Sequence, residues 1–180
     1  MTAPRTILSA ALLLLLGFVI VHPASASASE TTFGVAVAHG DQSSQAYDLF
    51  VTHAFSPWIE GERAALSPLV EGGLQLWERS DKTIWGGNAN VGLMLRFANG
   101  STVRPFIIGT FGIAQISSDQ FGNLDLGCKT QFRSRGSIGV DFGEGLRHTV
   151  KCSVTHYSNA SMSGDNDGYN TLGLSYGLTF

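Results

Sequence analysis

A histidine and a serine lie two residues apart in the stretch His156-Tyr157-Ser158-Asn159-Ala160. A serine hydroxyl becomes an effective nucleophile when an adjacent base takes its proton, and an imidazole is the usual base. The pair therefore indicates nucleophilic acyl transfer if both side chains share one face of their element. In a β-strand, residues two apart do share a face, and their Cα atoms are roughly 6 to 7 Å apart. The alternative is that the two residues are only the polar end of a strand.

The elements that must position this pair are β-strands, because apolar and polar residues alternate along most of the chain and helical periodicity is absent. Turn signals divide the chain into eight such segments: 32–39, 46–55, 69–77, 84–97, 103–116, 126–142, 146–158 and 168–180. The connections 98–101 and 143–145 are tight, whereas 117–125 and 159–167 are longer. Short turns at one end and longer loops at the other are typical of an even-stranded membrane barrel.

The last segment favours a membrane barrel over a soluble sandwich. One face carries only apolar and aromatic side chains, and the other carries small or polar ones: Leu172, Leu174, Tyr176, Leu178 and Phe180 against Thr171, Gly173, Ser175, Gly177 and Thr179. A soluble sandwich would place charges on its outward face, and this strand has none. The final Phe180 also resembles the C-terminal signature of outer-membrane barrels. We therefore predict an all-β fold, an eight-stranded antiparallel transmembrane β-barrel with its apolar faces toward lipid.

Other segments agree with this interpretation. In 84–97, Val91, Leu93 and Leu95 alternate with polar or small residues, and in 126–142 the other face carries Arg133, Arg135 and Asp141, which we expect to pair inside the barrel. Segment 103–116 is apolar on both faces and indicates no orientation.

Composition bounds the compartment. Residues 1–28 combine Arg5, an apolar run and Ala-Ser repeats, which predicts a secretory signal peptide cleaved after Ala26 or Ala28, leaving 29–180 as the barrel domain. As a membrane anchor the run would be short. The net charge of −3 and the absence of a basic cluster argue against nucleic-acid binding. Because the strands separate Cys128 from Cys152, we expect two free thiols.

The alternation in segment 146–158 assigns His156 and Ser158 to the lipid-facing side, at the loop end of the barrel. Pairing this segment with the last one across the loop 159–167 places Asn170 opposite His156, also facing outward. His156 would be the general base, Ser158 the nucleophile and Asn170 the group that orients the imidazole. Asn159, or a backbone N–H after it, is the candidate for stabilising the oxyanion. Equally, polar residues at this level can simply meet lipid headgroups and water.

The stretches "HYSNA" and "NDGYN", with "RPFIIGTFGIA" in segment 103–116, resemble the lipid A 3-O-deacylase family of Gram-negative outer membranes. The resemblance implies an outer-membrane serine esterase that removes the acyl chain ester-linked at the 3-position of lipid A, the membrane-embedded part of lipopolysaccharide. It implies a Ser-His-Glu triad on the outer barrel surface, in which His156 matches the base and Ser158 the nucleophile. It implies no cofactor.

Two positions depart from the family pattern. Asn170 stands where the family has Glu, and Ser161 replaces a small residue near the oxyanion segment. An Asn carbonyl can orient an imidazole but brings no negative charge. Asp165 or Asp167 could substitute, although turn formation explains both. A non-catalytic structural or interaction barrel with a degenerate triad, a soluble barrel that binds an apolar ligand, and a homodimer all remain open.

The remaining signals are weak. His39 and His53 lack metal-ligand spacing, so no metal site is predicted. Trp58, Trp77 and Trp85 lie near segment ends, as an interfacial girdle requires, with core packing as the alternative.

Overall fold

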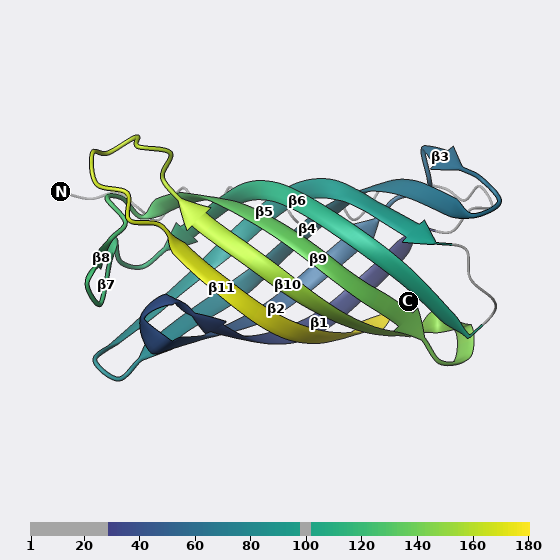
Figure 1. Cartoon of the computed structure of the whole chain (residues 1–180), viewed down its shortest axis with the longest axis horizontal. Helices are drawn as coiled ribbons and strands as arrows, with labels where there is room; N and C mark the ends of the chain where they lie inside the picture. Colours follow the sequence, from purple (N-terminus) through teal and green to yellow (C-terminus); the bar gives the residue numbers. More distant parts are fainter. Residues whose placement is uncertain (1–28, 98–101) are drawn as a thin grey trace.

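The computed structural model describes residues 29–97 and 102–180, and they form one closed antiparallel barrel of tilted strands (Figure 1). Eight long strands pair in chain order, and β1 closes the barrel by pairing with β11. They are β1 (Glu30–Gly40), β2 (Ser44–Ala54), β4 (Ala64–Arg79), β5 (Lys82–Phe97), β6 (Val103–Ile116), β9 (Thr130–Phe142), β10 (His148–Ser158) and β11 (Tyr169–Thr179). The predicted fold is confirmed. The predicted signal peptide (1–28) and the turn at 98–101 lie outside the described residues.

Short elements lie in the connections at both ends of the barrel. One end carries the 3₁₀ turn η1 (Asp41–Ser43) and the hairpin of β7 (Gln120–Phe121) with β8 (Leu124–Asp125), next to the β10–β11 loop. We call it the loop end. The opposite end carries β3 (Ile59–Glu60) and a second 3₁₀ turn, η2 (Glu144–Leu146). Within residues 29–97 and 102–180, no helix is long and apolar enough to cross a membrane.

The two largest differences between predicted and observed strand boundaries have physical reasons. Strand β4 begins at Ala64 and not at residue 69, because it continues past Pro68 to pair with β3 and the end of β5. Strand β9 begins at Thr130 and not at residue 126. Leu126 instead packs inside the loop end, and Gly127 adopts a positive φ of 69° that breaks the extended chain.

The outward face of the barrel is apolar, as predicted. On β11, Leu172 and Leu174 are 58% and 60% exposed, whereas Thr171 and Ser175, which flank them, are buried. Val91 and Leu93 on β5 and Val154 on β10 also point outward. This orientation contradicts the soluble-barrel alternative, in which the apolar faces would line the interior. It matches the lipid-facing wall of a membrane barrel.

The interior is layered along the barrel axis. At the loop end, an apolar layer includes Trp77, Phe121, Leu126, Tyr157 and Tyr169; nearer the other end, a second includes Leu69, Met94, Phe106 and Ile108. Strand β6 contributes inward side chains to both layers and outward side chains to lipid. Because both faces of β6 therefore have apolar surroundings, segment 103–116 is apolar on both faces.

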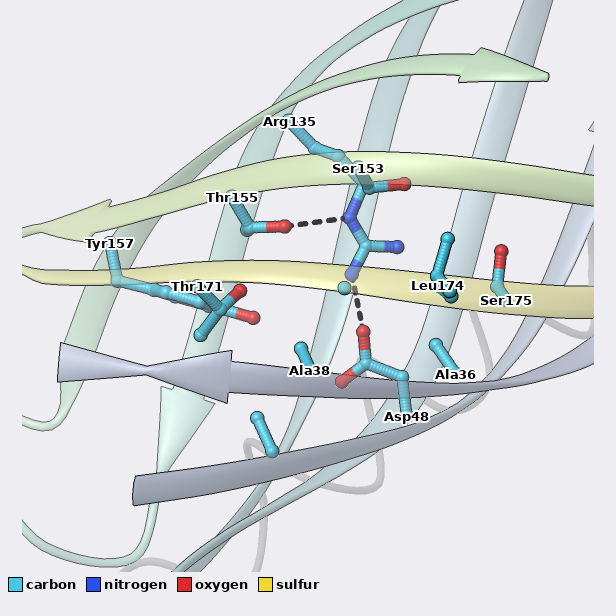
Figure 2. A pocket seen from close by; sticks show the side chains of 12 residues that line it. Ala36, Ala38, Asp48, Arg135, Ser153, Thr155, Tyr157, Thr171, Leu174 and Ser175 are labelled. Atoms are coloured by element: carbon cyan, nitrogen blue, oxygen red, sulfur yellow. Dashed lines mark hydrogen bonds and ion pairs between the residues drawn. The ribbon is translucent and has the colours of Figure 1, made fainter. Parts of the chain in front are cut away.

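A buried ionic cluster separates the two apolar layers. Glu71 is 3% exposed, and its carboxylate accepts hydrogen bonds from Arg133 (3.1 Å), Arg135 (3.2 Å) and Lys151 (3.2 Å). Arg135 also pairs with Asp48 and takes Thr155 as an acceptor, as Figure 2 shows. The cavity there measures only about 20 Å³, so the lumen is filled.

The predicted pairing of Arg133 and Arg135 with Asp141 on the same strand is wrong. Arg135 and Asp141 are separated by several residues along β9, roughly 20 Å, so the partners of both lie on other strands. Asp141 instead pairs with Arg104 (3.0 Å) and lies 3.7 Å from Arg96.

Trp77 differs from the predicted interfacial girdle. It lies fully buried in the loop-end apolar layer, whereas Trp58 and Trp85 are exposed near opposite ends of the barrel. The girdle interpretation therefore fails for Trp77. Cys128 and Cys152 are free thiols, as predicted.

Candidate functional site

His156, Ser158 and Asn170 lie together on the outer wall at the loop end. His156 and Asn170 are exposed and Ser158 is half-buried. The β10–β11 register places His156 directly opposite Asn170, and the imidazole Nδ1 lies 2.7 Å from Asn170 Oδ1. The imidazole Nε2 therefore remains available on the side away from Asn170.

Buried tyrosines fix the strand positions that carry these residues. Tyr157, between His156 and Ser158, points inward, where its hydroxyl donates to Gln75 (2.9 Å) and accepts from Arg133 Nε (3.1 Å). Tyr169, next to Asn170, also points inward. Because side chains alternate along a strand, anchoring each tyrosine inside directs its neighbours to the outer wall.

Gly168 sets the space beside the imidazole. Its φ of 71° is in the left-handed region, and a Cβ at this position would lie 3.2 Å from His156 Cε1. Glycine thus allows both the sharp entry into β11 and the close approach of the ring.

Two serines lie near the imidazole. Ser158 shares the strand and face of His156, while Ser134 on β9 is exposed and is the direct cross-strand partner of His156. Within the described ranges, no hydrogen bond joins either hydroxyl to the imidazole. A change of the Ser158 rotamer can close that gap, because residues two apart on a strand are neighbours on one face.

Asn159 points away from the outer surface. It is fully buried, and its Nδ2 donates to Leu126 O (2.8 Å), Ser163 Oγ (2.9 Å) and Asp165 O (2.6 Å). Its backbone N–H donates to Asn166 Oδ1 (2.9 Å). Asn159 therefore holds the β10–β11 loop against the barrel, and its donors are engaged.

The loop after Asn159 offers other donors. Ala160 and Ser161 are exposed, and both have a positive φ (52° and 61°), an unusual conformation for residues with a Cβ. Asn166 is half-buried, and because its Oδ1 faces the Asn159 N–H, its Nδ2 is turned elsewhere. No motif in the sequence indicates a role for Asn166.

Asp41 is the other residue near the site that the sequence pattern does not indicate. It lies in η1, at the turn from β1 to β2, and its Oδ2 accepts hydrogen bonds from Asn170 Nδ2 (2.9 Å) and from the Asn170 backbone N–H (2.7 Å). The substitutes considered from sequence are not in this position. Asp167 accepts from the Asp125 N–H (2.7 Å), and the exposed Asp165 carboxylate has no hydrogen bond within the described part of the chain.

A groove runs across the outer wall from His156. It is a shallow hollow, largely open to the outside, that crosses β10, β9, β6 and β5, and its volume is about 680 Å³. Its floor is made by Gly109 and Gly136, which are cross-strand partners, and a Cβ at either position would meet no atom within 4 Å. Phe111 and Val154 border it. Because a side chain at either position would have room, the two glycines leave a hollow in an otherwise apolar wall.

In residues 29–97 and 102–180, no group of three or more His, Cys, Asp or Glu side chains is placed to hold an ion. His53 instead bonds Thr31 Oγ1 (2.9 Å) and packs on Phe55, and His39 lies 3.4 Å from Gln45.

Comparisons with known proteins agree with the fold. A curated relative, lipid A deacylase PagL of Pseudomonas aeruginosa, is 29% identical over 159 residues, which cover 87% of this chain and 89% of the relative. The crystal structure of the outer membrane enzyme PagL superposes with a TM-score of 0.74 at 26% identity, covering 81% of this chain and 97% of that one.

A second structure shares the fold alone: Neisserial surface protein A superposes with a TM-score of 0.58 at 11% identity, covering 84% of this chain and 97% of its own. The family model described as lipid A 3-O-deacylase (PagL) matches residues 30–179. This chain is therefore an outer-membrane β-barrel that belongs to the lipid A 3-O-deacylase family.

Proposed function

We propose that this protein hydrolyses the ester that links an acyl chain to the 3-position of lipid A, with Ser158 as nucleophile and His156 as general base. Ser158 Oγ attacks the ester carbonyl carbon while His156 Nε2 takes the hydroxyl proton. The tetrahedral intermediate collapses, the bond to the sugar oxygen breaks, and His156 returns the proton to that oxygen. Water, activated by His156, then releases the fatty acid from Ser158. The observation that carries this proposal is the 2.7 Å contact between His156 Nδ1 and Asn170 Oδ1, which leaves Nε2 free to take the proton of Ser158.

The lipid-facing position of the site suits a substrate that stays in the membrane. His156 lies at one end of the groove, and Ser134, Gly136 and Gly109 form a track of small residues leading from it. Phe111 and Phe132, stacked 5.7 Å apart, border this track. An acyl chain lying along the track would gain apolar contact with Phe111 and Val154 without entering the filled lumen.

The oxyanion of the intermediate needs donors that are not already engaged. Asn159 is the anchor that fixes the loop, and we assign the oxyanion to Asn166 Nδ2 together with the backbone N–H of Ala160 or Ser161. In this assignment Ser161 contributes through its backbone. No metal or cofactor takes part. Every group of the site comes from one chain, so the reaction as proposed does not depend on a homodimer.

The test is mass spectrometry of lipid A from cells that produce the wild-type protein, Ser158→Ala or Ser134→Ala. Ser134→Ala is the matched control, because Ser134 is an exposed serine that also neighbours His156. We expect loss of one acyl chain with the wild type and with Ser134→Ala, and intact lipid A with Ser158→Ala. Loss of activity only in Ser134→Ala would reassign the nucleophile, and deacylation by Ser158→Ala would reject the serine mechanism.

One observation favours a second candidate function. Asn170 brings no charge to the imidazole, so the barrel could serve a structural or interaction role with a degenerate triad. That account predicts a folded, heat-modifiable barrel and unaltered lipid A in wild-type cells. It also predicts that Asn170→Glu switches deacylation on.

A further inference from the structure

We infer that Asp41 is a positioning residue that acts on His156 through Asn170, and that it supplies from the β1–β2 turn the negative charge that Asn170 lacks. This inference rests on the proposed function of the His156 and Ser158 pair. It begins with the chain of contacts from Asp41 Oδ2 to Asn170 Nδ2 (2.9 Å) and from Asn170 Oδ1 to His156 Nδ1 (2.7 Å).

The carboxylate fixes the orientation of the Asn170 amide. An ionised carboxylate can only accept hydrogen bonds, so the amide must direct its NH₂ group toward Asp41. The Asn170 carbonyl then faces the imidazole, and a carbonyl can only accept. His156 must therefore carry its proton on Nδ1, which leaves the Nε2 lone pair free to take the proton of Ser158. Without Asp41, the amide could rotate and offer NH₂ to the ring, which would favour the unproductive tautomer.

The carboxylate also polarises the amide. A hydrogen bond to a charged acceptor is stronger than a neutral one, and linked hydrogen bonds strengthen each other. As His156 becomes positively charged in the reaction, the Asp41 charge lies one amide away from it. The three groups thus reproduce, across two strands and a turn, the function of a carboxylate in direct contact with the ring.

The turn that carries Asp41 is held firmly. The Asp41 carbonyl accepts a hydrogen bond from Ser44 Oγ (2.7 Å), and Ser44 Oγ lies 2.8 Å from the buried Tyr169 hydroxyl. On the next residue, Gln42 Oε1 accepts from the Arg79 guanidinium and from the Asn123 N–H (3.0 Å). Asp41 is therefore presented to Asn170 by contacts that do not involve the triad.

The first test measures kcat and KM with lipid A in detergent micelles. Asp41→Asn keeps the size of the side chain and removes its charge, and we expect kcat to fall about tenfold to a hundredfold, the loss of one charge-assisted hydrogen bond, with KM little changed. Asp165→Asn is the matched control, an exposed loop acid without this contact, and should retain wild-type kcat.

A second background separates this role from a structural one. In Asn170→Glu, a carboxylate contacts the imidazole directly, so adding Asp41→Asn should change kcat less than about twofold. An equal loss in both backgrounds would assign Asp41 to folding of the turn and overturn the inference. Wild-type kcat in Asp41→Asn, when Ser158→Ala is inactive, would overturn it while leaving the proposed function intact.

A readout independent of catalysis is the ¹⁵N NMR spectrum of the imidazole in the folded barrel, at a pH where the ring is neutral. We expect the Nδ1–H tautomer of His156 in the wild type and a mixture of tautomers in Asp41→Asn. An unchanged tautomer would overturn the inference even if the wild-type protein proved inactive on lipid A.

Discussion

This barrel has two polar networks, the ionic cluster in the lumen and the site on the outer wall. They differ in whether their side chains keep hydrogen-bonding groups that have no partner. In the ionic cluster of the lumen, three cations surround Glu71 and Asp48, and every charge has a partner inside the wall. In the outer-wall site, one ring nitrogen of His156 is hydrogen-bonded, and the Ser158 hydroxyl has no hydrogen-bond partner among the described residues. A network in which every polar group has a partner stabilises the fold. A network that presents hydrogen-bonding groups without partners to the membrane can act on a substrate.

The largest effect is expected from His156→Ala, which tests whether the outer-wall site serves catalysis and not the fold. Because the imidazole is exposed, its loss should leave the barrel intact, while kcat falls about 10³-fold or more, a cost of about 4 kcal/mol in transition-state stabilisation. Deacylation kinetics and heat-modifiable migration on a gel measure the two effects separately. A destabilised barrel would show that the outer-wall site also serves the fold.

The converse change is Glu71→Gln in the lumen. It leaves Arg133 and Arg135 with Asp48 as their acidic partner and Lys151 with no ion pair among the described residues, so we expect the free energy of unfolding to fall by about 3 kcal/mol. Urea titration of the barrel in lipid vesicles measures this. The kcat per folded molecule should stay within about twofold of the wild type, because no cluster member contacts His156. A large loss of kcat would show that the ionic cluster and the outer-wall site are energetically coupled.

A smaller effect is expected from Gly136→Leu, which tests the apolar part of the outer wall. The new side chain has room to fit, so the fold should tolerate it, but it would fill the groove beside His156. We expect kcat/KM for lipid A to fall about tenfold to a hundredfold, with less effect on a short-chain ester. Val35→Leu, an outward change on β1 away from the groove, is the control. Equal losses on both substrates would argue against an acyl-chain groove.

The smallest effect should follow Tyr169→Phe, which removes the hydroxyl near Ser44 and keeps the ring in the loop-end layer. We expect the free energy of unfolding to fall by about 1 kcal/mol, because one buried hydrogen bond is lost and Ser44 keeps its bond to Asp41 O. Tyr47→Phe, an exposed tyrosine on the outer wall, is the control and should be neutral. A loss of several kcal/mol would show that the tyrosine hydroxyl is a central element of the loop end.

The sequence alone determined much of this architecture. A period of two residues assigns each side chain to one of two faces, so the strands, the lipid-facing wall and the outward direction of His156, Ser158 and Asn170 could all be predicted. The hairpin between β10 and β11 is local, and for that reason the pairing of His156 with Asn170 was also predictable and is confirmed.

Only the tertiary structure decided contacts between distant segments. Asp41 meets Asn170 because β1 closes the barrel against β11, and the register of that closure depends on the tilt and stagger of all eight strands. Likewise, Arg133 and Arg135 find Glu71 and Asp48 across the lumen, and Asn159 turns inward to anchor a loop. Alternation gives the direction of a side chain, but the partner it meets is set by how the whole sheet curls and closes.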